Sequence, residues 1–419
     1  MVSQAVSEVQ LVEKKQSTGR LRAVEWLNFF LADVQTGLGP FLAAFLAANG
    51  WNAGSVGYAL TFSGLVGVAL QTPAGAVIDA TRKKRALVAA ALGLLVGGAV
   101  LLALRTTKPH VYSALFLIGS AGPFLGPAVA AITLGIVGAK AFDAQFGRNQ
   151  AFNSAGNVAS ALLMAAVSYL MGLRWIFIAS AMLAIPAWAC LARIDGKSID
   201  YARSRGARAA DHNAKNEGFR ELLKDRVLLY FLLSVFLFHL ANAAMLPELG
   251  EMLSHGNPRT AAPFMSACII VTQVVIALSA TWIGRRAESS GRKKLLLAGF
   301  GVLPIRGLLY TLTNLPAALI AIQVLDGVAN AIFTVVAVLV IKDRTEGTGR
   351  FNVAAGALAT LQGIGAALSN GVGGAIVQVA GFRASFAGLA AIAVLALAVL
   401  IWLVPETGNG SAKANQAMA

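Results

Sequence analysis

Two related loops in the sequence decide the fold. The first reads Gly75-Ala-Val-Ile-Asp79-Ala-Thr-Arg82-Lys83-Lys84-Arg85-Ala-Leu87, and the second reads Gly284-Arg-Arg-Ala-Glu288-Ser-Ser-Gly291-Arg292-Lys293-Lys294-Leu-Leu296. Each loop lies between two long apolar runs and places a basic cluster at the end of one of them. Basic clusters at helix ends bind the anionic headgroups of the cytoplasmic leaflet. The loops therefore indicate a membrane protein that makes the same inner-face turn twice.

The two loops belong to a longer internal repeat with an offset of 209 residues. The same offset relates further residues on later apolar runs: Gly156 to Gly365, Gly172 to Gly381, Arg174 to Arg383 and Phe177 to Phe386. One offset that spans several runs predicts two units of the same orientation joined in tandem. A parallel repeat of this kind places a binding site near the middle of the membrane, between the halves.

Composition supports a polytopic membrane protein. Charged residues make up 13% of the 419 residues and apolar residues 57%, whereas a soluble domain has about 25% charged residues. A spanning helix needs about 20 mostly apolar residues. Twelve such runs occur, at 24–47, 55–78, 86–104, 111–138, 151–170, 175–192, 227–247, 260–283, 295–313, 316–341, 351–378 and 382–404. The sequence thus predicts an all-α membrane protein with 12 transmembrane helices in two parallel six-helix repeats.

The distribution of basic residues predicts the orientation in the membrane. With both termini inside, 28 of the 34 Lys and Arg residues lie on the inner side, five lie in outer loops, and Arg306 lies within a span. This asymmetry follows the positive-inside rule. We therefore expect a bacterial inner-membrane protein with both termini in the cytoplasm. Its expected parts are a cytoplasmic N-terminal segment 1–23, a six-helix bundle 24–192, a basic cytoplasmic linker 193–226, a second six-helix bundle 227–404, and a cytoplasmic tail 405–419.

Both loops resemble the signature loop of the major facilitator superfamily, G-x-x-x-D-x-x-G-R-K-x-x-L. The second copy has Glu288 where the signature has Asp, and the first has Arg82 where the signature has Gly. The resemblance extends over residues 24–404. It implies a secondary transporter that works by alternating access, with the first, fourth, seventh and tenth helices lining the cavity.

The resemblance also implies that the two loops form a conformational latch on the inner side. The simpler explanation, that they serve only to set topology, stays open. The latch residues are Gly75, Asp79, Arg82, Lys83, Lys84, Gly284, Glu288, Gly291, Arg292 and Lys293. The glycines are expected to let neighbouring helices approach closely.

Subfamily signatures do not fix the substrate. The antiporter signature of drug exporters, G-x-x-x-G-P-x-x-G-G, is expected within 151–170, but that stretch contains no proline. Sugar-porter signatures are not apparent either. The direction of transport and the class of substrate therefore stay open at this point.

Four ionisable residues lie deep inside the predicted spans: Asp33, His239, Arg306 and Asp326. A charge at the centre of a membrane helix costs about 2.5–3.5 kcal/mol, so such residues usually have a function. Arg306 and Asp326 lie at similar depth on consecutive antiparallel helices, which predicts an ion pair that is either functional or a structural tie. Asp33 has no cationic partner in its own half, and burial favours the protonated form of a carboxyl group.

We therefore assign proton coupling to Asp33, His239 and Asp326. His239 can relay protons or bind substrate, or it can be a packing residue. Substrate binding is assigned to polar residues that share the spans with these groups: Gln35, Asn157, Asn242, Arg306, Asn330 and Gln362. Each amide can equally be a hydrogen bond between helices, worth about 0.6–2 kcal/mol.

Missing motifs exclude other classes of protein. The sequence has no G-x-x-x-x-G-K-[ST] phosphate-binding loop, no G-x-S-x-G or H-E-x-x-H motif, and no metal-binding spacing of Cys and His. We therefore expect no enzyme activity, no cofactor and no metal. We also expect no nucleic acid as a partner. The expected partners are a small-molecule substrate, H⁺ and the lipid bilayer, in which the protein is expected to be a monomer.

The favoured function is proton-coupled efflux of a drug-like compound or metabolite. The mostly apolar spans, with few fixed charges, suit an amphipathic or weakly charged substrate. One alternative is uptake of an organic acid or of a siderophore-like, metal-chelating metabolite, with Arg306 as the anion clamp. Another is a membrane sensor or scaffold of the same fold that transports nothing.

Overall fold

The computed structural model describes residues 19, 21–35, 38, 41–201, 204, 224–256, 258–345 and 351–407. The expected segment 1–23, linker 193–226 and tail 405–419 therefore lie partly outside the described residues. Within the described ranges every regular element is helical, and ten helices are long and apolar enough to cross a membrane.

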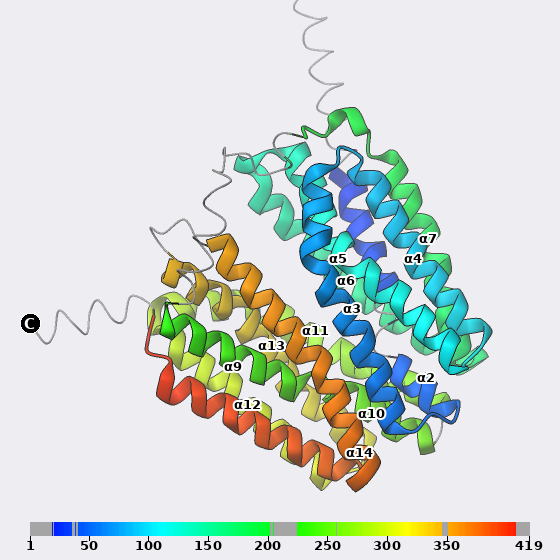
Figure 1. The fold of residues 1–419 in the computed structure, drawn as a ribbon, viewed down its shortest axis with the longest axis vertical. Helices are drawn as coiled ribbons and strands as arrows, with labels where there is room; N and C mark the ends of the chain where they lie inside the picture. The colour runs from blue at the N-terminus through cyan, green and yellow to red at the C-terminus, as the bar shows by residue number, and fades with distance from the viewer. Residues whose placement is uncertain are drawn as a thin grey trace, which may run out of the picture. The chain divides into compact units, whose positions relative to one another are not determined.

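Residues 21–35 form the first helix. The elements that follow are α2 (Leu42–Ala48), α3 (Ala53–Ala80), α4 (Lys84–Leu104), α5 (Lys108–Val137), α6 (Ala139–Met171), α7 (Arg174–Arg193), a 3₁₀ turn η1 (Gly196–Ser198), α9 (Arg226–Asn242), α10 (Met245–Gly256), α11 (Pro258–Ser290), α12 (Arg292–Leu312), α13 (Pro316–Thr345) and α14 (Phe351–Leu403), as Figure 1 shows.

Breaks within the helices reconcile the ten span candidates with the twelve predicted spans. The long helix α14 contains two spans, because Gly381 has φ 84° and ψ 171° and interrupts it. The predicted span 24–47 contains the helix of residues 21–35 and the short helix α2, neither of which reaches the length of a span candidate by itself.

The predicted span 227–247 is also divided, into α9 and α10. The backbone N–H of Ala244 at their junction donates to Ser369 Oγ at 2.9 Å.

Two predicted loops are helical. Residues 139–150 were expected to connect two spans, but α6 begins at Ala139. Residues 248–256 were expected to lie outside the seventh span, but they belong to α10. Both stretches carry polar side chains, charged and amide groups in the first and two glutamates in the second, which lower the local hydropathy although the backbone stays helical. Hydropathy marks the part of a helix in contact with hydrocarbon and not its full length.

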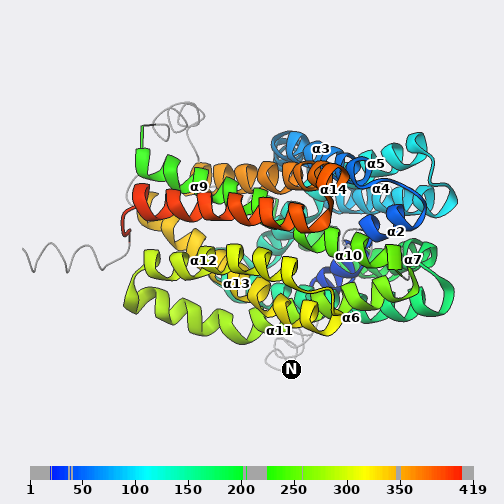
Figure 2. The ribbon, with the colours of Figure 1, turned by 90° about the horizontal axis from the view of Figure 1, so that it is seen from below.

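The described chain packs as two compact units. The first comprises residues 1–39, 69–167 and 174–209, and the second comprises 40–68, 168–173 and 210–419, each as far as described. In the first unit α4 packs against α5 and α7. In the second unit α14 packs along α9 and α12, and α13 packs along α11 and α12 (Figures 1 and 2). The short helix α2 packs against α10.

The internal repeat of the sequence is also a repeat of backbone geometry. Gly172 and Gly381 are 209 residues apart, and both have a positive φ, of 99° and 84°. At Gly156 a Cβ atom would overlap with the carbonyl oxygen of Phe29, and at Gly365 it would overlap with that of Phe236. Equivalent glycines therefore make equivalent close helix contacts in the two units.

Replacing Gly365 with alanine is therefore expected to destabilise the protein. The added methyl group would force α14 away from α9, and such overpacking costs about 1–3 kcal/mol. Gly356 lies on the same helix, and a Cβ there would meet no described atom within 4 Å. Gly356→Ala is the matched control and should leave the melting temperature in detergent unchanged or slightly raised. Equal melting temperatures for the two variants would contradict this close contact.

Candidate functional site

A buried ion pair lies at the centre of a polar cluster in the second unit. Arg306 on α12 contacts Asp326 on α13, with Nη1 and Oδ1 2.6 Å apart. The Arg306 side chain is 1% exposed and that of Asp326 is 9% exposed. The two residues lie on consecutive helices, and the ion pair expected from the sequence is present.

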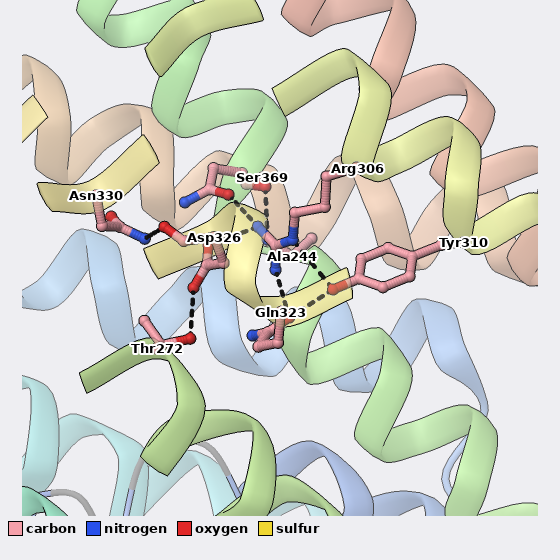
Figure 3. A network of polar contacts seen from close by, with 9 residues as sticks. Ala244, Thr272, Arg306, Tyr310, Gln323, Asp326, Asn330 and Ser369 are labelled. Atoms are coloured by element: carbon pink, nitrogen blue, oxygen red, sulfur yellow. Dashed lines mark hydrogen bonds and ion pairs between the residues drawn. The ribbon is translucent and has the colours of Figure 1, made fainter. Parts of the chain in front are cut away.

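Further side chains surround the guanidinium group (Figure 3). Arg306 donates from Nη1 to Asn242 Oδ1 at 2.5 Å, from Nε to the Tyr310 hydroxyl at 3.1 Å, and from Nη2 to Gln323 Oε1 at 3.4 Å. The Tyr310 hydroxyl donates to the same Gln323 oxygen at 2.5 Å. Thr272 Oγ1 donates to Asp326 Oδ2 at 3.2 Å. This Arg306 cluster thus links four helices: α9, α11, α12 and α13.

The arrangement of the Arg306 cluster decides what it can do. A buried cation is tolerated when its hydrogen-bond donors are paired, and removing one partner is strongly destabilising. Since the guanidinium already contacts four protein side chains and is almost fully enclosed, it is not open to a substrate anion in this structure. The cluster can change its partners only if the helices that carry them move relative to one another.

Asp33 has a different environment, in the first unit. It lies on the helix of residues 21–35 and is 3% exposed. Its backbone carbonyl oxygen accepts a hydrogen bond from Ser160 Oγ of α6 at 2.8 Å, whereas its carboxylate Oδ1 is buried and has no partner in the part of the chain that the structure describes. Gly156, one turn before Ser160, allows α6 to approach this helix closely. No cation pairs with Asp33 among the described residues.

The first unit contains a second polar cluster that sequence reasoning missed. Gln145 Nε2 donates to Glu25 Oε1 at 3.0 Å and to Asn149 Oδ1 at 3.1 Å. Asn149 in turn donates to Thr133 Oγ1 at 3.1 Å. Gln145 and Asn149 lie in 139–150, which the sequence analysis assigned to a loop. Their spacing of four residues, one helical turn, was the signal that could have found them.

The remaining predicted coupling and binding residues are spread over several helices. His239 is buried against Phe238 and Phe333, with ring centroids 5.2 and 4.6 Å away, and its Nδ1 has no hydrogen-bond partner within the described ranges. Gln35 is exposed and donates to the backbone of its own helix. The other amides are placed as follows: Asn157 donates to Asn153, Asn330 donates to the carbonyl oxygen of Asp326, and Gln362 is half-buried on α14. Asn330 thus contacts the Arg306–Asp326 pair through the backbone of Asp326.

The two predicted latch loops each make the same kind of contact within their own unit. Lys84 Nζ donates to the carbonyl oxygen of Ile78 at 2.6 Å, and Arg292 Nη1 donates to that of Ala287 at 2.5 Å. Ile78 and Ala287 are 209 residues apart. In both units a buried basic side chain thus binds a carbonyl group near the end of the preceding helix, where the helix dipole favours a cation.

The second loop has further contacts. Arg292 Nε pairs with Asp343 Oδ2 of α13 at 3.0 Å. The Glu406 carboxylate accepts the backbone N–H groups of Arg292 and Lys293, at 2.7 and 3.1 Å, and so caps the N-terminus of α12. Sequence reasoning missed Glu406 because it lies more than 100 residues from its partners.

The first loop differs from the second at the residue where the sequence departs from the signature. Gly291 in the second loop has a positive φ of 89°. Arg82 occupies the equivalent position of the first loop, 209 residues earlier, and its φ is not positive. Arg82 and Lys83 instead line a cavity of about 480 Å³ together with Arg85, Trp188 and Tyr201.

The structure corrects the expectation for two glycines of the loops, and the role expected for the two acidic residues stays a prediction. Close helix contact was expected at Gly75 and Gly284, but no described atom lies within 4 Å of a Cβ at either position, since both lie on half-exposed helix surfaces. Asp79 is exposed at the end of α3. The side chain of Glu288 lies outside the described residues.

Comparison with known proteins now identifies the family. The model of the Major Facilitator Superfamily matches residues 26–287 and 241–418. The chain is 40% identical over 389 residues to two uncharacterized MFS-type transporters of Mycobacterium tuberculosis, Rv2456c of strain H37Rv and MT2531 of strain CDC 1551. The match covers 92% of this chain and 93% of each relative. The chain belongs to the major facilitator superfamily.

Solved structures confirm the major facilitator fold. The nucleoside transporter NupG superposes with a TM-score of 0.76 at 15% identity, over 92% of this chain and 98% of that chain. A D-xylose-proton symporter superposes with a TM-score of 0.70 at 14% identity, over 93% and 98%. The protein is therefore a secondary transporter of the membrane and not an enzyme.

Proposed function

We propose that this transporter exports a weakly charged organic molecule, such as a drug-like compound or a metabolite, in exchange for protons. The observation that carries the proposal is the Asp33 carboxyl group, which is 3% exposed and has a buried oxygen that no described residue contacts by a hydrogen bond. A carboxyl group removed from water and not paired with a cation can bind and release a proton near neutral pH. This property is what a coupling residue needs.

Competition for one carboxyl group determines the direction of coupling. If the proton and the substrate bind at Asp33 in turn, one conformational change carries the proton across the membrane. The return change then carries the substrate across in the opposite sense. The two then move in opposite directions. Because the proton gradient of a bacterial inner membrane points inward, the substrate moves outward.

The related structures support proton coupling on this fold only in general terms. A D-xylose-proton symporter shares the fold. Uptake of an organic acid has less support, because Arg306, its anion clamp, is 1% exposed and already bound to Asp326. A sensor or scaffold of the same fold stays the alternative from another class, and it would show no flux under any gradient.

Transport in proteoliposomes tests the proposal. A thermal-shift screen of the purified protein against metabolites and toxic organic compounds first identifies a binder, because a ligand that binds the folded state stabilises it. The flux of that compound is then measured with and without an imposed proton gradient. We expect accumulation on the side from which protons leave. Flux that ignores the proton gradient would contradict proton coupling, and no flux of any binder would favour a sensor.

The proposed orientation places both termini in the cytoplasm. The native cysteines Cys190 and Cys268 are buried, so single surface cysteines can be labelled against a low background. A cysteine at Ser198, in the predicted linker, should resist a membrane-impermeant thiol reagent applied to intact cells. A cysteine at Lys108, in a predicted outer loop, is the matched control and should react. The opposite labelling pattern would reverse the topology derived from the positive-inside rule.

A further inference from the structure

Two carboxylic side chains on α10 are buried and take no part in the sites described above. Glu248 is 3% exposed and Glu251 is 2% exposed. One carboxylate oxygen of each, Glu248 Oε2 and Glu251 Oε1, is buried and has no hydrogen-bond partner among the described residues. An ionised carboxylate buried in this way would be very costly, and ionisable residues inside a membrane helix usually mark an ion or proton path.

The hydrogen bonds of Ser385 show how Glu248 avoids this cost. Ser385 Oγ lies 2.9 Å from Glu248 Oε1 and 3.2 Å from the carbonyl oxygen of Gly373. A serine hydroxyl has a single hydrogen. If Glu248 is ionised, Ser385 can donate to only one of these two acceptors. If Glu248 is protonated, it donates to Ser385, Ser385 donates to Gly373, and both contacts become hydrogen bonds.

The backbone around Glu248 is shaped to hold this carboxyl group. A Cβ atom at Gly373 would overlap with Glu248 Oε1 and would lie 3.0 Å from the Cβ of Ala244. Glycine at 373 is therefore required for the carboxyl group to enter the contact between α10 and α14. Two spans meet at this point, because Gly373 and Ser385 lie on opposite sides of the Gly381 break in α14.

We propose that Glu248 is a proton-binding site and that the bound proton stabilises the contact between α10 and α14. The donor order is Glu248 to Ser385 to the carbonyl oxygen of Gly373. Loss of the proton leaves a buried carboxylate and one unpaired acceptor at this contact. Deprotonation therefore favours the separation of α10 from α14.

The surroundings of Glu248 contain no described cation that would keep it ionised. Glu251, one turn further along α10, is the acidic neighbour, and it supplies no positive charge to Glu248. Helix α2 carries no ionisable residue, and the ionisable residue of α14, Arg383, is exposed. The other ionisable residues on elements that adjoin α10 are His255 on α10 itself, Arg226, Tyr230 and His239 on α9, and Arg259, Cys268, Arg285, Arg286 and Glu288 on α11. Of these, Arg226 is exposed, and the side chains of His255, Arg259 and Glu288 lie outside the described residues.

The test is the pH dependence of thermal stability of the full-length purified protein. The folded state binds a proton that the unfolded chain releases, so the stability due to Glu248 is present at low pH and is lost as the pH rises. Glu248→Gln keeps a donor toward Ser385 and cannot ionise. Between about pH 6 and about pH 9 its melting temperature should fall by about 2–4 °C less than that of the wild type.

Glu251→Gln is the matched control, since it removes an equally buried carboxylate from the same face of α10. It should keep the part of the wild-type pH dependence that Glu248→Gln removes. If Glu251→Gln removes the pH dependence and Glu248→Gln does not, the proton-binding site is not Glu248. Restoration of the stability at high pH by Na⁺, and not by choline, would show that a metal cation occupies the site, and would also overturn the proposal.

A second measurement decides the matter if Glu248→Gln does not fold. Dicyclohexylcarbodiimide reacts with protonated carboxyl groups in apolar surroundings, and the modified residue is located by mass spectrometry of the wild-type protein. We expect modification at Glu248 at neutral pH, decreasing at alkaline pH. Modification at Glu251 alone would contradict the assignment.

The inference deepens the proposed proton coupling, but its test does not depend on transport. If wild-type liposomes show no proton-driven flux, proton coupling fails as the proposed function, whereas the melting curves still report proton binding at Glu248. If both hold, Glu248→Gln should slow substrate exchange, because the contact can no longer be released by deprotonation.

Discussion

Replacing Asp326 with asparagine is expected to lower the free energy of unfolding by about 3–5 kcal/mol. The change leaves the Arg306 guanidinium, 1% exposed, without its counter-charge at 2.6 Å. Asn242, Tyr310 and Gln323 can still accept or share hydrogen bonds with it, but none of them carries a negative charge. A buried cation without an anion is the costly species, so the loss exceeds the value of one hydrogen bond.

A double-mutant cycle separates this pairing from the other effects of the substitution. Arg306→Gln alone leaves Asp326 unpaired, and the double variant Arg306→Gln, Asp326→Asn removes both charges. The double variant should recover part of the stability, as measured by thermal or denaturant unfolding in detergent. Additive losses would mean that the two side chains do not interact in the folded protein.

A half-exposed ion pair gives the matched control. Asp225 and Arg344 lie 2.7 Å apart with side chains 22% and 35% exposed. Asp225→Asn retains an oxygen that can cap α9 at Leu228, so the substitution mainly removes the ion pair. Its cost should be about 0–1 kcal/mol, because solvent screens the pair. A loss similar to that of Asp326→Asn would show that burial is not what makes the Arg306 pair important.

These clusters show how far the sequence could predict the site. Arg306 and Asp326 are charged residues in apolar runs on consecutive helices, so their pairing follows from the expected topology. Tyr310 and Gln323 belong to the same cluster but resemble ordinary span residues, and only three-dimensional packing brings the hydroxyl within 2.5 Å of the amide oxygen. The partners of a buried charge therefore need the structure even when the charge itself is evident.

The missed acidic residues have a common physical cause. Glu25 lies at the edge of an apolar run, and Glu248 and Glu251 lie just beyond the end of another, so none of the three stands out as a charge inside a predicted span. In the structure Glu25 is 9% exposed, Glu248 3% and Glu251 2%. Carboxyl groups lower the mean hydropathy of the helix ends that carry them, so a hydropathy window ends before these residues and does not predict that they are buried.

Asp33→Asn should abolish proton-driven accumulation of the substrate while leaving exchange of the substrate down its own gradient. The asparagine amide is close in shape to a protonated carboxyl group but cannot release a proton. Ser160 donates to the backbone carbonyl oxygen of Asp33 at 2.8 Å and not to its carboxylate, so the substitution leaves the contact between this helix and α6 unchanged. The expected defect is therefore in coupling and not in folding.

The assay compares two fluxes in the same proteoliposomes. Counterflow of the unlabelled and labelled compound reports the conformational cycle without a proton gradient, and accumulation under an imposed gradient reports coupling. Ser160→Ala is the matched control, because it removes the hydrogen bond beside Asp33 and keeps the carboxyl group; it should retain accumulation. If Asp33→Asn still accumulates the compound in response to the gradient, the coupling proton binds elsewhere. Glu248 is also a buried carboxyl group without a described cationic partner. Combining Asp33→Asn with Glu248→Gln would then show whether Glu248 carries the coupling proton.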